Sequence, residues 1–186
     1  MLEHGGVSIG QSVSINYYVA QHCGMLGSNP AETATILAFQ EHLKELGEVW
    51  SKSVPYGTEP AAAFLDSFFD DASASDYTGA ADGSKRANRA LLWFLGRMEG
   101  LVGGNGFAVG EKLSLADVLL HKTFADSLKP EDCSGELPAY RREPFGSLER
   151  STKALAKFPK LAKIVANVAA HPNMQKWMST RGKQGF

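Results

Sequence analysis

The 186-residue chain has little cysteine, little net charge and no long apolar run. Its two cysteines, Cys23 and Cys133, form no C-x-x-C pair and are too few to cross-link a secreted fold, so we expect free thiols and a cytoplasmic location. A formal net charge of -1 from interspersed acids and bases gives no extended field for nucleic acid or anionic membrane. We also expect no signal peptide and no membrane span. Small molecules or proteins are the expected partners.

The common catalytic and metal-binding motifs are missing as well. The five histidines have no metal-ligand spacing such as His-x-x-x-His, and no Gly-x-Ser-x-Gly elbow of a hydrolase is present. The glycine-rich residues 103–106 are not followed by Gly-Lys-Ser/Thr and do not follow a strand, so they predict a turn between helices rather than a phosphate loop. We therefore predict no metal site.

The most informative stretch that is present runs from residue 106 to residue 120. Ser114 stands where a helix should begin, and Asp117 follows three residues later, which predicts a reciprocal capping box with a shorter acid than the usual Glu or Gln. The residues from Leu113 to Leu120 are apolar on nearly every face. This helix should therefore lie in the middle of a helical bundle.

The chain opens with two short strand segments around Gly5-Gly6, which predicts a tight hairpin. A helix should follow from Gln11-Ser12 and end at Gly24. Because a lone hairpin is unstable in water and no further strand is predicted downstream, we expect the chain to begin partway through a domain.

The rest of the chain predicts a mostly α fold. Its apolar spacings indicate a long amphipathic helix after Asn29-Pro30, a short helix at 61–69, and further helices at 87–102 and 161–168. Residues 70–83 are small and acidic and predict a mobile loop, whereas residues 129–152 should be irregular or only briefly helical. After His171-Pro172 the chain should restart a helix, with Met174, Trp177 and Met178 facing inward.

Three motifs together resemble the cytosolic glutathione transferases, and most nearly their sigma, mu and pi classes. They are the Gly-Phe-x-Val-Gly-x-x-Leu-Ser-x-Ala-Asp stretch, the Gln-Ser pair after the hairpin, and the C-terminal pattern Phe-Pro-x-Leu followed by Val-Ala-x-His-Pro-x-Met-x-x-Trp-Met. The resemblance implies that residues 1–27 are a remnant of a thioredoxin-like glutathione-binding domain, reduced to a β-hairpin plus a helix. Residues 28–186 would form the all-helical C-terminal bundle.

The resemblance also implies which residues bind glutathione, the co-substrate. Gln11 and Ser12 would hold its γ-glutamyl carboxylate, and Glu45 would approach the glutamyl amine across the interface of a homodimer. Trp50 and Tyr56 could line a pocket for an apolar electrophile. Each residue also has a plain structural explanation: a helix cap for Ser12, a solvated helix acid for Glu45, and core packing for the two aromatics.

The implied activity is attack of the glutathione thiolate on a small electrophile. The resemblance places the thiol-activating residue before the hairpin, so we expect Met1 to be an internal residue of a longer protein and the chain as written to be nearly inactive. The alternative is a non-catalytic relative that uses the helical bundle for binding or assembly. The retained Gln11-Ser12 pair favours the enzyme lineage.

Overall fold

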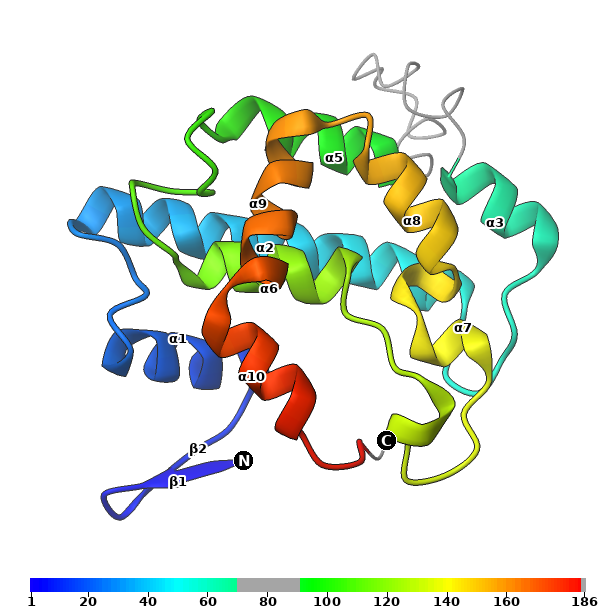
Figure 1. Cartoon of the computed structure of the whole chain (residues 1–186), viewed down its shortest axis with the longest axis horizontal. Coiled ribbons are helices and arrows are strands. Elements are labelled where there is room, and N and C mark those ends of the chain that lie inside the picture. Colours follow the sequence, from blue (N-terminus) through cyan, green and yellow to red (C-terminus); the bar gives the residue numbers. More distant parts are fainter. Residues whose placement is uncertain (70–90, 185–186) are drawn as a thin grey trace.

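The computed structural model describes residues 1–69 and 91–184, and it begins with the predicted hairpin. Strand β1 (Leu2–His4) pairs antiparallel with β2 (Val7–Ile9), so that Leu2 lies opposite Ile9. The two glycines between them have φ angles of 58° and 78°, the left-handed geometry of a tight hairpin turn. Figure 1 shows this hairpin projecting beside helix α1 (Ser12–His22), away from the larger helical body.

The larger body is helical, which confirms the predicted mostly α fold. Its α-helices are α2 (Pro30–Ser53), α3 (Ala62–Phe69), α5 (Leu91–Leu101), α6 (Leu115–Phe124), α7 (Ala139–Arg142), α8 (Leu148–Leu155), α9 (Pro159–Ala170) and α10 (Pro172–Thr180). Two short 3-10 turns, η2 (Pro130–Asp132) and η3 (Pro144–Gly146), lie on either side of α7. None of the described helices is both long and apolar enough to cross a membrane.

Helix α6 occupies the centre of this body, as its sequence predicts. It packs against α9, α2 and α8 (Figure 1), and its Ala116 and Leu120 are fully buried. Around it the largest fully buried side chains include Phe39 on α2 and Phe94 on α5. Full burial of such a side chain stabilises the fold by about 1.5–3 kcal/mol.

Helix α2 follows the apolar spacing of its sequence. The Asn29 side chain accepts the Glu32 N–H at 3.0 Å, and Pro30 occupies the first turn, where its missing N–H costs nothing. The helix then buries one face through Ile36, Phe39, Leu43 and Leu46. This long helix supports the central α6 along one side.

One local prediction is wrong in part. Trp177 and Met178 do not face inward: they are 45% and 37% exposed, and only Met174 is partly buried. Residues 129–152 are irregular with short helical pieces, as predicted, except that α8 begins there and continues to Leu155. The Ser147 side chain caps this helix, and Ala154 and Leu155 anchor it in the core. The predicted mobile loop at 70–83 and the first residues of the predicted helix at 87–102 lie outside the described residues.

Candidate functional site

The start of α1 is an open helix N-terminus. Gln11 is its N-cap residue, with φ 65° and ψ 128°, and no side chain makes a cap hydrogen bond there. The first backbone bond of the helix runs from the Ile15 N–H to the Gln11 carbonyl at 3.0 Å. The N–H groups of Ser12, Val13 and Ser14 come before that bond, at the positive end of the helix dipole. This arrangement is suited to an anionic group.

The structural explanation predicted for Ser12, that its side chain caps the helix, is wrong. Ser12 is the first helical residue rather than the N-cap, and no cap bond from its side chain is found in the described chain. Gln11 takes the cap position in the left-handed φ region, which is rare for a residue other than glycine and costs about 1–3 kcal/mol. Both residues are exposed. Strain combined with exposure is typical of binding sites.

A cluster of rings fixes the hairpin against α1. The His4 Nδ1 atom lies 2.6 Å from the Tyr18 hydroxyl, and the Tyr18 and His22 rings are 4.3 Å apart between centroids. The His4 and His22 rings contact each other edge to face at 5.6 Å. These contacts join β1 to α1.

The start of α6 is closed, in contrast to that of α1. Asp117 is fully buried, and its carboxylate accepts the Ser114 N–H at 2.7 Å, the Ser114 hydroxyl at 2.5 Å and the Ala108 N–H at 2.7 Å. The predicted capping box is present. Burial raises the pKa of Asp117, and the hydrogen bonds from Ser114 and Ala108 oppose that rise. These donors are used inside the protein, so this motif is structural.

Glu45 lies on the exposed side of α2, with 54% of its side chain accessible. Its carboxylate is 3.9 Å from the His42 Nδ1 atom, one turn earlier in the helix. No hydrogen bond or ion pair joins Glu45 to Gln11 or Ser12 within the described chain. The described residues thus show no direct link between Glu45 and the adjacent pair Gln11-Ser12.

Trp50 and Tyr56 line one cavity of about 390 Å³ near the end of α2. Trp50 also packs in an aromatic cluster, 5.5 Å from Phe64 and 5.3 Å from Phe68 between ring centroids. Tyr56 is 85% exposed, and the Arg141 guanidinium lies 3.9 Å from the centre of its ring. Trp50 thus belongs to both the core and the cavity, whereas Tyr56 lies at the surface.

A larger cavity, of about 790 Å³, went unpredicted by the sequence. Side chains of α6, α7 and α10 form its walls, together with Met25 and the C-terminal residues Arg181 and Gln184. Because these residues are far apart in the chain, no local sequence pattern predicts the cavity. It shares Arg141 and Glu143 with the cavity at Tyr56, so α7 separates the two.

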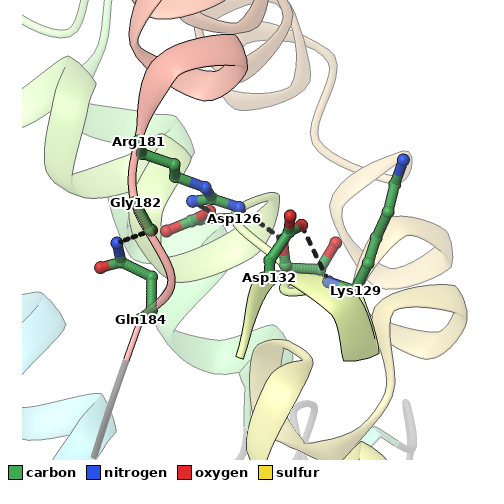
Figure 2. A network of polar contacts seen from close by, with 7 residues as sticks. Asp126, Lys129, Asp132, Arg181, Gly182 and Gln184 are labelled. Atoms are coloured by element: carbon green, nitrogen blue, oxygen red, sulfur yellow. Dashed lines mark hydrogen bonds and ion pairs between the residues drawn. The ribbon is translucent and has the colours of Figure 1, made fainter. Parts of the chain in front are cut away.

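An ion pair and hydrogen bonds hold the C-terminal segment beside this larger cavity. The Arg181 guanidinium, 4% exposed, forms an ion pair with Asp126 at 3.0 Å and also donates to the Ser127 carbonyl. Further along, the Gln184 N–H donates to the Asp132 carbonyl at 2.7 Å. Figure 2 shows Arg181 and Gln184 lying beside Asp126 and Asp132. One wall of the cavity is thereby fixed.

Among the residues that the structure describes, no group of three or more His, Cys, Asp or Glu side chains is placed to hold a metal ion. The two cysteines are free thiols, with Cys23 exposed and Cys133 buried.

Comparison with known proteins gives the fold. No protein-family model matches the chain. Among solved structures it is similar to the monomeric glutathione S-transferase Na-GST-3 of the hookworm Necator americanus, with a TM-score of 0.62 and 20% identity over 99% of this chain and 74% of that one. A GST of the nematode C. elegans gives a TM-score of 0.62 and 20% identity, with 97% and 72% of the two chains covered. A Pi-class glutathione S-transferase of Onchocerca volvulus gives 0.59 and 20%, with 93% and 65% covered. The chain therefore has the glutathione S-transferase fold, as its sequence motifs predict.

Proposed function

We propose that this chain binds glutathione at the start of α1 and acts in a transferase that conjugates glutathione to small electrophiles. The open N-terminus of α1, with exposed Gln11 and Ser12, is the observation that carries the proposal. In this reading residues 1–27 supply part of the glutathione-binding domain, and residues 28–186 form the helical domain. The fold of the chain supports the same reading.

The chemistry of the first turn fits the γ-glutamyl carboxylate. The N–H groups of Ser12, Val13 and Ser14 can donate to a carboxylate, and the Ser12 hydroxyl adds a further donor. Such charge-assisted bonds are each worth about 1.5–3 kcal/mol. Fixing the tripeptide in this way would orient its thiolate toward the electrophile, and orientation is a large part of catalysis in bimolecular reactions.

Two further roles belong to the proposal. The cavity at Trp50 and Tyr56 would accept the apolar part of the electrophile, since its walls include Val54 and Phe145. Glu45, exposed on α2, would be accessible to a second copy of the chain, and in a homodimer its carboxylate would approach the glutamyl amine.

Calorimetric titration with glutathione tests the proposal directly. Cysteinylglycine, which lacks the γ-glutamyl group, is the matched ligand, and we expect it to bind at least about tenfold more weakly because the carboxylate contact is missing. Ser12→Ala should weaken glutathione binding, whereas Ser179→Ala on α10 should leave it unchanged. If neither peptide binds, the proposal is wrong and the non-catalytic interaction module becomes the better explanation.

A further inference from the structure

His4 and His22 lie side by side where the hairpin meets α1. His4 is the last residue of β1 and His22 is the last residue of α1, so the fold brings together two histidines that are well separated in the chain. Their rings are 5.6 Å apart between centroids and nearly perpendicular, at 89°. Both residues are exposed, so an ion from solvent can reach them.

Tyr18 holds one nitrogen of each ring. The His22 Nδ1 atom lies 2.8 Å from the Tyr18 carbonyl oxygen. A carbonyl only accepts, so this bond places the proton of a neutral His22 ring on Nδ1 and leaves the lone pair on Nε2. The His4 Nδ1 atom lies 2.6 Å from the Tyr18 hydroxyl, whose oxygen can accept in the same way. Among the residues that the structure describes, neither Nε2 atom makes a hydrogen bond.

Metal-binding histidines in proteins have this arrangement. One ring nitrogen binds the metal, while the other donates its N–H to a carbonyl or another oxygen, which fixes the tautomer and the ring orientation. A zinc ion held by two imidazole nitrogens in tetrahedral geometry places the two ring centroids roughly 5 Å apart. The observed separation of 5.6 Å is close to this value.

The charges around the pair favour a cation. His22 lies in the last turn of α1, at the negative end of the helix dipole. No lysine or arginine occurs in β1, β2 or α1, and the first such residue of the chain is Lys44. The one acid in these three elements is Glu3, next to His4. A divalent ion between the two rings therefore meets no competing cation from the elements that form the site.

We propose that His4 and His22 bind one zinc ion through their Nε2 atoms, with water as the remaining ligands. Two protein ligands make this an open surface site, unlike a closed structural site with four. The ion links β1 to the end of α1. The sequence predicted no metal site, because these two histidines form no local motif. Gln11 and Ser12 lie at the other end of α1, so zinc binding and glutathione binding can fail independently.

Calorimetric titration of the full chain with zinc chloride is the test, and we expect saturable binding of one ion per chain. His4→Gln and His22→Gln should each weaken it by at least about tenfold, because losing a ligand is no milder than losing its hydrogen-bond partner. His42→Gln, which changes a histidine of α2 outside the pair, should leave the affinity unchanged. Absence of saturable binding would overturn the inference, as would full affinity in both variants of the pair.

Two further variants test the neighbours of the pair. Tyr18→Phe retains both imidazoles and removes only the hydroxyl that contacts His4, so zinc binding should weaken by about tenfold. Cys23→Ser changes the exposed thiol next to His22 and should not alter binding. Loss of zinc binding in Cys23→Ser would assign the ion to the thiol and overturn the inference.

Nitrogen NMR of the imidazole rings needs no substitution, so it is unaffected if a variant disturbs the hairpin. Zinc should shift the Nε2 signals of His4 and His22 and leave their Nδ1 atoms protonated. Shifts confined to His42, His121 or His171 would overturn the inference.

Discussion

Helices α1 and α6 both begin near a serine, and the polar groups at their starts are used in opposite ways. At α6 the buried Asp117 carboxylate accepts bonds from Ser114 and Ala108, and the start of the helix is inaccessible to solvent. At α1 the residues Gln11 and Ser12 are exposed, and no side chain caps the helix in the described structure. The same local chemistry stabilises the fold at α6 and leaves the start of α1 without a side-chain cap.

The comparison shows why a serine at a helix start does not by itself indicate function. What separates the two cases is whether groups of the same chain already accept the donors at the helix start. At α6 the Asp117 carboxylate accepts the Ser114 N–H and the Met25 carbonyl accepts the Leu115 N–H, whereas the first turn of α1 holds no acidic residue. Substitutions at the two starts should therefore affect different properties.

The largest effect is expected from Asp117→Ala. It leaves the buried N–H groups of Ala108 and Ser114 without an acceptor, and we expect a loss of about 3 kcal/mol or more in the free energy of unfolding. Chemical denaturation measures this loss, and Asp117→Asn, which retains one acceptor oxygen, should lose less. A stability close to that of the wild type would show that the closed start of α6 does not stabilise the fold.

The paired serine substitutions come next in size. Ser114→Ala should lower the free energy of unfolding by about 1–2 kcal/mol, since the capping box is lost in a buried site. Ser12→Ala should change it by less than about 0.5 kcal/mol, because the side chain is exposed and makes no cap bond. Thermal melting of both variants checks the difference. Equal losses would remove the distinction between the two helix starts.

A smaller effect on stability, one that depends on pH, is expected from His121 near the C-terminal end of α6. Burial lowers the pKa of His121 in the last turn of α6, so the folded protein binds this proton more weakly than the unfolded chain does. The stabilising contribution of neutral His121 is therefore complete above pH 6.5, the ordinary pKa of histidine, and is lost as the pH falls through the folded pKa.

Relative to His121→Gln, the wild type should thus become less stable as the pH is lowered below 6.5. His22→Gln, at the exposed end of α1, provides the matched control. Denaturation at a series of pH values measures the difference between the curves. A constant difference across that range would contradict the account of His121.

The smallest effect on stability is expected from Glu45→Gln. Its carboxylate lies 3.9 Å from His42 at an exposed position, and such pairs contribute less than about 1 kcal/mol. If Glu45 approaches glutathione from a second copy, the substitution should weaken glutathione binding while leaving the melting temperature unchanged. Glu41→Gln, on the same helix, is the control that should change neither.

Local sequence patterns predicted most of the fold. Asn29 and Pro30 begin α2, Gly24 follows α1 with a φ of 67°, and Ser114 with Asp117 begins α6. In each case the signal and the structure lie within a few residues of each other, so short-range chemistry is enough. The binding role of Gln11 and Ser12 rests instead on the resemblance to glutathione transferases around them, and it stays a prediction.

Features that depend on distant residues were not predicted. The larger cavity combines residues from Met25 to Gln184, and nothing in the local sequence indicates the positive φ of Gln11. Trp177 follows an apolar spacing but is 45% exposed beside Arg181, whose guanidinium lies 4.9 Å from its ring centre. Helical spacing indicates which residues share a face, but it does not specify what covers that face.

Amide NMR during a titration with glutathione tests the central claim most directly, because it reports on the two helix starts in one sample. The account predicts that the N–H signals of Ser12, Val13 and Ser14 shift as glutathione is added, while those of Ser114 and Ala108 stay in place. Shifts confined to other parts of the chain, or none at saturating glutathione, would contradict it.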